Sequence, residues 1–569
     1  MANRTAVARR RSRCKPNHAR LRLGSWACAL LFVVVGPTAA QHDVHRNAVR
    51  KIAAGDLNAA DAMLEPVADD PETLYLKSWL AALRKRPDEA LTAARRAVQA
   101  GLPVERFVAG PRDAFESSTA DSEFRRWAED RASPLLHGPL LGRVTDRAAA
   151  VWVRTARPAT VRVVVRASEE DEAVEVGGDA QTTAERDYTA VVQVAGLKPQ
   201  TGYDYQVLVD GKPMLDPRPR FRTSPPQNRA ASFTIAFGGG AGFVPEHERM
   251  WDTIRQRAPH ALLMLGDNIY SDDPTQSWTQ HYCYYRRQSR PEWRQLTART
   301  AVYAIYDDHD FGTDDCIPGP EVDQPPWKRD VWRRFQQNWN NPAYGGGEAQ
   351  PGCWFDFSIG DVHFILLDGR YYRSRSGTPS MLGPVQKAWL LETLKNSRGT
   401  FKVLASPVPW TEGVKPGSKD PWDGFPEERE EIFRFIEQQR VEGVVLIAAD
   451  RHRSDLRITR RENGYDLYEF ESSRLTNRHT HPVVQTPGLV FGYNKTCSVG
   501  MMHFDTTKAD PQVRYEIVDI DGRTVHSAIV LHSQLKADRT VDVLTPGRCP
   551  GVVRPIWPKA IPTLPYAAR

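Results

Sequence analysis

The stretch AVYAIYDDHDFGTDD, residues 301–315, passes directly from an apolar and aromatic run into five aspartates and one histidine. Apolar runs without alternation are typical of β-strands that are buried on both faces, as in sheets covered by helices. Carboxylates this close repel one another and raise one another's pKa values, so they are tolerated on a solvated loop or beside a cation. This stretch alone therefore leaves an acidic turn and a cation site open.

The same kind of run recurs across residues 231–535. The other runs are SFTIAFG, ALLMLG, VHFILL, FKVLAS and GVVLIAA, and two helical patterns with a proline near their start separate the later ones, PVQKAWLLETLKN and FPEEREEIFRFIEQQR. Short buried strands that alternate with amphipathic helices are typical of layered α/β folds. We therefore predict an α/β domain over residues 231–535.

Polar side chains follow four of these runs at the point where each predicted strand ends. They are Asp267, Asn268 and Tyr270, then Asp307, Asp308 and His309, then Asp368 and Arg370, and finally Asp450 and His452. Ligands bind at the carboxyl ends of strands in layered α/β sheets, so we expect these side chains to meet in one place. Helix-capping aspartates explain any one of the four positions well and all four poorly.

The donor types indicate the chemistry of this site. Carboxylates, an amide and imidazoles without a Cys-x-x-Cys pattern favour hard or borderline cations. Two such ions suit phosphate esters, because they lower the pKa of a water and neutralise the phosphoryl oxygens. The sequence contains neither a P-loop nor a Gly-x-Ser-x-Gly elbow, so we predict a metal-activated water as the nucleophile.

Six blocks in this order carry a resemblance to a known family: LGDNIYSD, YDDHDFGTDD, LLDGRYYRS, MLGPVQKAWL, FPEERE and ADRHRSDL. The chain resembles the PhoD-like alkaline phosphatases of the calcineurin-like metallophosphoesterase superfamily from Gly138 to Leu535. The resemblance implies a layered β-sheet metallophosphoesterase domain that hydrolyses phosphate mono- or diesters. It also implies two or more divalent metal ions, with Ca²⁺, Mn²⁺ or Zn²⁺ as the expected ones.

The resemblance implies a role for individual residues of the metal shell. Asp267 would bridge two metals, and Tyr270 would ligate one of them through its phenolate. Asp308 stands where the wider superfamily has asparagine, and Asp314 stands where family members often have asparagine. The implied metal ligands are Asp267, Tyr270, Asp308, Asp314, Asp450 and His452.

The remaining implied roles concern proton transfer and substrate binding. His309 would protonate the leaving alkoxide. Asn268, Arg370 and Arg451 would contact the substrate, and the two arginines could hold phosphate oxygens. An arginine beside acids is as often part of a structural ion pair, so that alternative stays open for both.

The chain departs from the family pattern at its first strand end. Family members usually carry Phe-Gly-Ser-Cys there, and that thiolate ligates an iron, whereas this chain reads FGGGAGF with Gly240 at the cysteine position. The departure argues against iron. The glycines could bring backbone N–H groups close to a phosphate or could form a loose turn. Ala449 replaces a family glycine, which is tolerable unless that backbone needs a positive φ.

A histidine pair follows later in the chain. His479 and His481, in TNRHTHP, could be extra ligands because short His-rich tracts can bind metal. Such a pair is more often solvated loop, and that is the interpretation we expect.

The first 40 residues indicate export. They carry eight Lys or Arg and no acid, followed by the apolar run WACALLFVVVG and the ending PTAA. This is the pattern of a signal peptide cleaved near Ala40, which would deliver the protein to the periplasm or the extracellular space; a membrane anchor is the alternative. Without these residues the net charge changes from +6 to −2, and nothing in the bulk charge suggests nucleic-acid binding.

Two further domains are predicted before the α/β domain, and a tail after it. Residues 43–132 read as a helical segment that resembles tetratricopeptide repeats, with Pro71 and Pro87 at helix starts. It has too few copies to bury a core, so we expect it to dock on the rest of this chain or on a protein partner. Residues 137–226 read as a fibronectin III or Ig-like β-sandwich, in which LKPQTGY resembles the tyrosine corner. Residues 536–569 form a proline-rich tail.

The sequence is compatible with two functions. The favoured one is an exported metal-dependent phosphoesterase, because the proton donor and most ligands are present. The other is a catalytically degenerate surface protein that uses its first two domains to bind partners. Metal-dependent turnover of a phosphate ester would separate the two.

Overall fold

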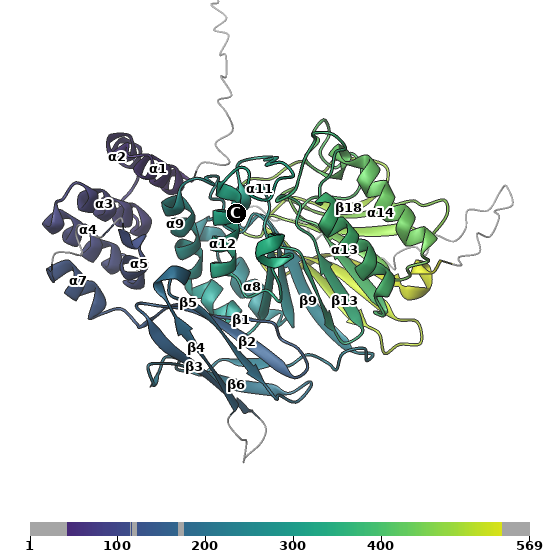
Figure 1. Ribbon diagram of the computed structural model, residues 1–569, viewed down its shortest axis with the longest axis horizontal. Coiled ribbons are helices and arrows are strands. Elements are labelled where there is room, and N and C mark those ends of the chain that lie inside the picture. Colours follow the sequence, from purple (N-terminus) through teal and green to yellow (C-terminus); the bar gives the residue numbers. More distant parts are fainter. Residues whose placement is uncertain (1–42, 114, 116–121, 169–175, 538–569) are drawn as a thin grey trace, which may run out of the picture. The chain divides into compact units, whose positions relative to one another are not determined.

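The computed structural model describes residues 43–113, 115, 122–168 and 176–537 (Figure 1). The predicted signal peptide and all of the predicted tail except Lys536 and Ala537 lie outside the described residues. Within the described part, no helix has both the length and the apolar composition that crossing a membrane would require.

The first described region is helical, as predicted. Its helices are α1 (Val44–Ala53), α2 (Leu57–Leu64), α3 (Pro71–Leu83), α4 (Pro87–Gln99), α5 (Glu105–Ala109) and α7 (Ser122–Glu129). Pro71 and Pro87 each open a helix, where the missing N–H of proline costs nothing. Asp43, Asp56 and Asp70 cap the first three helices by accepting backbone hydrogen bonds from their first turns. These local signals explain why the helices begin where they do.

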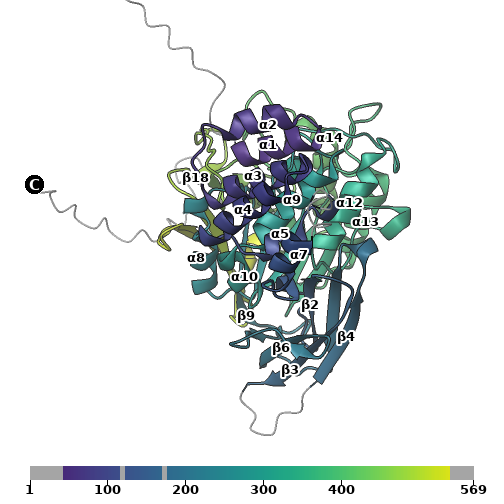
Figure 2. The same ribbon diagram turned by 90° about the vertical axis from the view of Figure 1, so that its left-hand side faces the viewer.

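This helical segment packs against α9 (Ser277–Gln288), as Figures 1 and 2 both show. The buried carboxylate of Glu72 accepts a hydrogen bond from Arg106 at 2.7 Å and another from the hydroxyl of Tyr282 on α9 at 2.9 Å. Asp43 forms an ion pair with Arg286, also on α9. The segment therefore docks on its own chain.

Residues 135–168 and 176–222 form two antiparallel sheets. The first contains β1 (Leu135–Gly142), β2 (Ala148–Thr155) and β5 (Thr189–Ala195) in the order β1-β2-β5. The second has the order β4-β3-β6-β7, with β8 on β6, and its strands are β3 (Ala159–Ala167), β4 (Val176–Thr182), β6 (Gly202–Val209), β7 (Lys212–Pro213) and β8 (Arg220–Arg222). Burial alternates along β3, as expected for a strand with one buried face. The hydroxyl of Tyr203 accepts a hydrogen bond from the backbone N–H of Lys198 at 2.8 Å, which is the bond that the LKPQTGY motif predicts.

The α/β domain contains two sheets. The six-stranded sheet has the order β11-β10-β9-β19-β20-β21, with β9 (Ser232–Gly238), β10 (Ala261–Leu265), β11 (Ala301–Ile305), β19 (Ser498–Asp505), β20 (Gln512–Asp519) and β21 (Thr524–Leu531). The seven-stranded sheet has the order β12-β13-β14-β15-β17-β16-β18, with β12 (Phe355–Ile359), β13 (Val362–Leu366), β14 (Phe401–Ala405), β15 (Val444–Ala448), β16 (Ser454–Thr459), β17 (Leu467–Ser472) and β18 (Leu489–Tyr493). All six strands predicted from apolar runs are present, three in each sheet, and each set of three is parallel.

Aromatic side chains fill the space where the two sheets face each other. Phe364 on β13 packs against Phe233 on β9 and Phe504 on β19, with ring centroids 6.4 and 5.9 Å apart. Phe470 on β17 stacks on Tyr515 of β20 with centroids 4.5 Å apart. Because both sheets share this core, the carboxyl ends of strands from both sheets can reach one site.

Besides α9, the α/β domain contains further helices. They are α8 (Met250–Gln256), α10 (Pro291–Thr297), α11 (Asp308–Phe311), α12 (Trp327–Asn338), α13 (Gly383–Asn396) and α14 (Pro426–Gln438). Helix α14 begins at Pro426 with Glu427 and Glu428 in its first turn, as predicted, where the helix dipole favours acids. Figure 1 shows α13 and α14 side by side on the part of the domain that holds β13.

The buried charges beneath the helical segment give a test of how it is held. We expect Glu72→Gln to lower the free energy of unfolding by about 3 kcal/mol, because Arg106 would keep its buried charge without a counter-charge. The matched control is Glu89→Gln, which removes an exposed pair with Arg86 and should cost less than about 1 kcal/mol. Urea unfolding followed by tryptophan fluorescence measures both. Equal losses in the two variants would show that the buried pair does not hold the segment.

Candidate functional site

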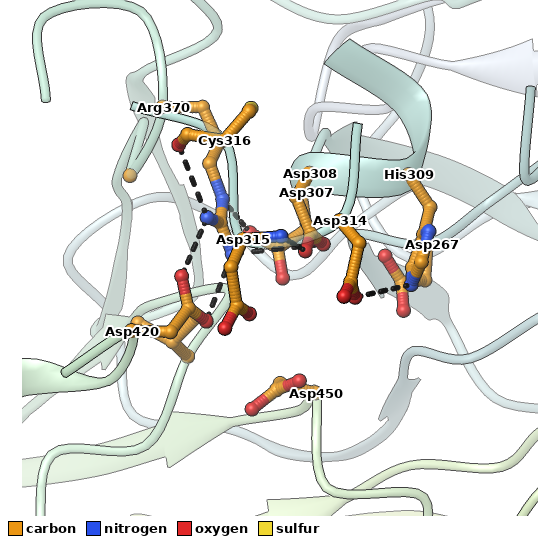
Figure 3. Close-up of polar contacts among 12 residues, drawn as sticks. Asp267, Asp307, Asp308, His309, Asp314, Asp315, Cys316, Arg370, Asp420 and Asp450 are labelled. Atoms are coloured by element: carbon orange, nitrogen blue, oxygen red, sulfur yellow. Dashed lines mark hydrogen bonds and ion pairs between the residues drawn. The ribbon is translucent and has the colours of Figure 1, made fainter. Parts of the chain in front are cut away.

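The site begins where β10 and β11 end. Asp267 lies two residues after the end of β10, and Asp308, the first residue of α11, lies three residues after the end of β11. One ligand atom each from Asp267, Asp308 and His309 lies within 4.8 Å of the others, and all three residues are buried. Figure 3 shows these side chains directed toward a common space that Asp450 approaches from the opposite side.

The end of β15 in the other sheet completes the site. The hydroxyl of Tyr270 lies 2.8 Å from Asp267 Oδ2 and 2.7 Å from His452 Nε2. His452 Nε2 in turn lies 3.7 Å from Asp267 Oδ2. The structure therefore brings together the strand ends of both sheets, as the sequence predicts.

Several of these residues have a strained backbone. The φ angles are +55° at Asp267, +53° at Tyr270, +67° at Asp450 and +49° at His452. Residues other than glycine rarely adopt this left-handed conformation, which costs about 1 kcal/mol or more at each position. Such strain persists only where the surrounding structure holds the backbone in place. Here the left-handed backbone directs the side chains of four predicted ligands toward one site. Ala449 is not among the positive-φ residues, so its methyl group is tolerated there.

Buried atoms at the site have unused hydrogen-bonding capacity. Asp267 Oδ1, Asp450 Oδ2 and His452 Nδ1 have no hydrogen-bond partner among the described residues. Burial raises the pKa of Asp267 well above its ordinary value; the imidazole of His309 opposes that rise, and the carboxylate of Asp308 adds to it. A bound cation favours ionised carboxylates, so it would remove this cost. The predicted ligands therefore fit a metal centre.

Arg370 is enclosed by carboxylates. It is 0% exposed and pairs with Asp307 through Nε and with Asp420 through NH1 at 2.7 Å. Its NH2 lies 3.6 Å from Asp308. Burial raises the pKa of Asp308, but the positive charges of Arg370 and His309 outweigh burial, so the pKa of Asp308 is lowered overall. This geometry fits the ion-pair alternative for Arg370 and leaves it no exposed surface for a substrate.

The side-chain nitrogen of Asn268 is also committed to its surroundings, whereas its Oδ1 has no hydrogen-bond partner among the described residues. Its side-chain amide is 1% exposed and donates hydrogen bonds to Ile305 O at 2.9 Å and to Asp310 Oδ2 at 2.8 Å. Asp310 accepts backbone N–H groups of Asn268 and Ile269 as well. In this structure Asn268 holds Asp310 and has no exposed donor for a substrate.

Arg451 and Asp314 lie at the edge of the same space. Arg451 NH1 is 3.7 Å from Asp450 Oδ2. The side chain of Asp314 is 75% exposed, and its Oδ1 lies 3.7 Å from His309 Nε2. Asp314 also has a ligand atom within 4.8 Å of those of Asp308 and Asp315. Asp314 is thus placed where a substrate or a metal could reach it, whereas Arg451 is buried beside Asp450.

The ring of His309 is held in place through Nδ1. Nδ1 contacts Asp272 Oδ1, and the ring stacks on Tyr270 with centroids 4.6 Å apart. Burial by itself lowers the pKa of His309, but the nearby carboxylates, chiefly those of Asp308 and Asp267, outweigh it and hold that pKa well above its ordinary value. The ring is thereby suited to carry a proton on Nε2.

The predicted solvated loop at His479 and His481 differs from the structure. Both rings are half-buried and lie beside His452, with ring centroids 5.2 and 5.7 Å from it. Each of the three rings offers one nitrogen within 4.8 Å of the others. The loop folds back because Thr480 Oγ1 donates a hydrogen bond to His452 O at 3.0 Å, a tertiary contact that the sequence does not reveal.

Some residues at the site were not predicted. Asp272, beside His309, belongs to the LGDNIYSDD segment, whose acidic end was a usable signal. Asp420 and Arg46 reach the site from distant parts of the chain, where no local pattern singles them out. Asn477 lies against the imidazole of His452 at 3.5 Å and likewise carries no signal.

The glycine turn at Gly240 excludes a larger residue. Its φ is +68°, and an added Cβ would lie 2.8 Å from Arg474 N and 3.0 Å from His452 Cδ2. The backbone N–H groups of Gly239 and Gly240 donate to carbonyl oxygens of Ser472 and Gly266. The turn is therefore close-packed, and these N–H groups are already used, which removes the alternative that they bind a phosphate.

The chain is similar in sequence to known phosphatases. The family model described as PhoD-like phosphatase matches residues 235–522, about half of the 569-residue chain. Residues 132–228 match a domain of unknown function, DUF7800. Alkaline phosphatase D of Bacillus subtilis (strain 168) is 23% identical over 316 residues, which make up 46% of this chain and 53% of that protein. The chain thus matches about half the length of this relative.

Solved structures show the same fold. A structure of PhoD matches with a TM-score of 0.56 and 17% identity, covering 70% of this chain and 93% of that one. The purple acid phosphatase PPD1 from yellow lupin (Lupinus luteus) seeds matches with a TM-score of 0.54 and 11% identity, covering 70% of this chain and 75% of that one. At these identities the similarity establishes the fold alone.

The packing around Gly240 generates a test. We expect Gly240→Ala to lower the free energy of unfolding in chelator by about 2 kcal/mol more than Gly417→Ala does, because overpacking adds to the backbone strain. Gly417 is the matched control: its φ is +78° and nothing lies within 4 Å of an added Cβ. The control variant should lose only about 1 kcal/mol, the cost of the left-handed conformation. Similar losses in the two variants would show that the turn has room for a side chain.

Proposed function

Because the chain belongs to the PhoD-like phosphatase family, we propose that it is a metal-dependent phosphoesterase that hydrolyses phosphate monoesters, phosphate diesters or both. The observation that carries the proposal is the convergence of Asp267, Asp308 and His309, whose ligand atoms lie within 4.8 Å of one another. A cluster of buried carboxylates suits an anionic phosphate ester only when cations are present.

The metal shell follows from the donors at the site. We assign it to Asp267, Tyr270, Asp308, Asp314, Asp450 and His452. Oxygen and imidazole donors favour Ca²⁺, Mn²⁺ or Zn²⁺, and Gly240 supplies no thiolate that would favour iron. When bound, the metals supply a water of lowered pKa as nucleophile and neutralise the charge of the phosphoryl oxygens.

The chain's own residues bind the ester and move the proton. His309 donates the proton on Nε2 to the oxygen of the leaving alcohol, while Asp272 holds Nδ1 and so fixes the orientation of the ring. Arg451 is the arginine proposed to hold a phosphate oxygen, since it lies at the edge of the site beside Asp450. Arg370 instead offsets the negative charges of Asp307 and Asp420, with which it forms ion pairs.

The other regions are assigned from sequence and fold together. We propose that the protein is exported by a signal peptide that ends near Ala40, and that it acts in the periplasm or the extracellular space. The two antiparallel sheets of residues 137–226 support a fibronectin III-like domain. The antiparallel pair of α3 and α4 supports a tetratricopeptide-like segment over residues 43–132.

A metal-dependence assay tests the proposal directly. Protein stripped with chelator should hydrolyse neither p-nitrophenyl phosphate nor bis-p-nitrophenyl phosphate, and added Mn²⁺, Ca²⁺ or Zn²⁺ should restore turnover of at least one ester. Asp267→Ala should stay inactive with every metal, because the variant would lack a buried carboxylate that would hold the metals. Absence of metal-dependent turnover in the wild type would favour the alternative, a surface binding protein.

The role of His309 makes a separate prediction. We expect His309→Ala to retain metal but to slow turnover by about 10²–10⁴-fold, the usual contribution of a general acid. Esters of alcohols with low pKa should be affected least, because their leaving groups need little protonation. Rates for a series of aryl and alkyl phosphates check this, and an equal slowing of all esters would exclude His309 as the proton donor.

A further inference from the structure

Three imidazoles meet at the edge of the carboxylate site. His479 Nε2 and His481 Nε2 are 3.1 Å apart, and both rings lie beside the buried ring of His452. His452 Nδ1 is buried and has no hydrogen-bond partner in the described part of the chain. The cluster therefore combines closely spaced nitrogens with an unused one.

The spacing of the His479 and His481 nitrogens is that of neighbouring ligands on one metal ion. Zn–N bonds of about 2.0–2.1 Å at tetrahedral or octahedral angles place adjacent nitrogens about 3–3.4 Å apart. A hydrogen bond between His479 and His481 would explain their own contact, but it would not explain why His452 also offers a nitrogen within 4.8 Å.

The loop that carries the two histidines is held in place. His479 N–H donates to Asn477 Oδ1 at 3.1 Å, and Asn494 Nδ2 donates to His481 O at 2.9 Å. With the bond from Thr480 to His452 O, these contacts fix the backbone on both sides of the pair. Rings on a backbone fixed in this way are preorganised to bind an ion.

We propose that His452, His479 and His481 form a three-imidazole site for one borderline divalent cation, with Zn²⁺ as the type. The inference rests on the proposed function only in that His452 would serve both this site and the carboxylate centre. Three protein nitrogens leave a coordination position open, as in catalytic zinc sites, for water or for an oxygen of a bound phosphate.

Cobalt binding tests the three-imidazole site independently of catalysis. The wild type, the double variant His479→Asn/His481→Asn and the control His363→Ala are stripped with chelator, loaded with Co²⁺ and desalted. His363 is a suitable control because it contacts Asp356 and Ser397 rather than the site. The double variant should retain one cobalt ion per chain fewer than the wild type and the control.

Equal cobalt content in the wild type and the double variant would overturn the proposal. Thermal unfolding in chelator shows whether the double variant folds; if it does not, the single variant His481→Gln takes its place in the same comparison. A wild type that lacks phosphoesterase turnover would contradict the proposed function. The difference in cobalt content would still decide the three-imidazole site.

A second, independent observation links the helical segment to His309. Arg46 on α1 donates hydrogen bonds through NH1 to Tyr270 O at 3.0 Å and to Asp272 Oδ2 at 2.5 Å. The other oxygen of Asp272 contacts His309 Nδ1. Arg46 is buried, and its segment lies outside both regions that the family models match.

The helical segment is anchored firmly enough for this contact to matter. Asp43 pairs with Arg286, and Glu72 accepts a hydrogen bond from Tyr282. The ring of Tyr75 stacks on that of Tyr282 with centroids 6.2 Å apart. Contacts with the middle of α9 and with its carboxyl-terminal turn thus fix the position of the helical segment.

We infer that Arg46 is a positioning residue for the proposed reaction. By holding Asp272, it keeps the carboxylate against His309 Nδ1, so that Nε2 points to the leaving group. This inference rests on the proposed function, and it gives the helical segment a role within its own chain instead of in docking a protein partner.

Leaving-group dependence and hydrogen exchange test Arg46 together. Arg46→Ala should lower kcat for alkyl phosphates about 10-fold more than for p-nitrophenyl phosphate, with KM nearly unchanged, and Arg46→Lys should restore part of the loss. Amide exchange of residues 268–273 should accelerate in Arg46→Ala. The control is Arg50→Ala, an exposed position on the same helix, which should change neither quantity.

An equal effect on all esters, or unchanged exchange at residues 268–273, would overturn the positioning role. Absence of turnover in the wild type contradicts the proposed function, and in that event the exchange measurement alone decides whether Arg46 holds the Asp272 segment.

Discussion

The burial of several carboxylates in one place, which disfavours their charged forms, is the constraint on which the site depends. Asp267, Asp307, Asp308 and Asp310 are all buried where β10 and β11 end. Burial raises the pKa of Asp307 well above its ordinary value despite the opposing charge of Arg370, and it raises the pKa of Asp310 to about 6. Arg370, His309 and backbone N–H groups offset part of this cost. Among the described residues, Asp267 Oδ1 has no hydrogen-bond partner, so it is an atom that could contact a cation.

The two-sheet architecture makes this concentration of charge stable. The six-stranded sheet presents Asp267 and Asp308, and the seven-stranded sheet presents Asp450 and His452, across a shared aromatic core. Rigid buried strands can hold the left-handed backbone of these residues, which a flexible loop would relax. Arg370 enters from the loop after β13 and pairs with Asp307 and Asp420. The sheets, the strained backbone and the ion pairs therefore all hold the acidic side chains in one place.

The sequence allowed much of this to be predicted, because the relevant signals are local. A strand buried on both faces leaves an apolar run, a helix start leaves a proline or a capping residue, and a strand end leaves the first polar side chain. Pro71, Pro87 and Pro426 and the six apolar runs illustrate this, and each element formed where it was expected. The grouping of Asp267, Asp308 and His309 followed from the same local reasoning.

What could not be predicted depends on tertiary partners. Arg370 and Asn268 carry donors that suit a substrate, and only the fold shows that Asp420 and Asp310 already occupy them. The pair at His479 and His481 has the composition of a solvated loop until Thr480 ties it to His452. The contact between Arg46 and Asp272 joins residues more than 200 positions apart, and no sequence pattern encodes such a pair.

The central claim is that the buried carboxylates hold cations, and anomalous X-ray scattering tests it most directly. Crystals grown with Mn²⁺ and measured above and below the manganese absorption edge would locate every bound ion. The account predicts anomalous peaks within bonding distance of Asp267, with Asp308, Asp450 and His452 among the ligands. Crystals in which manganese is absent from these carboxylates, or is bound only at the protein surface, would contradict it.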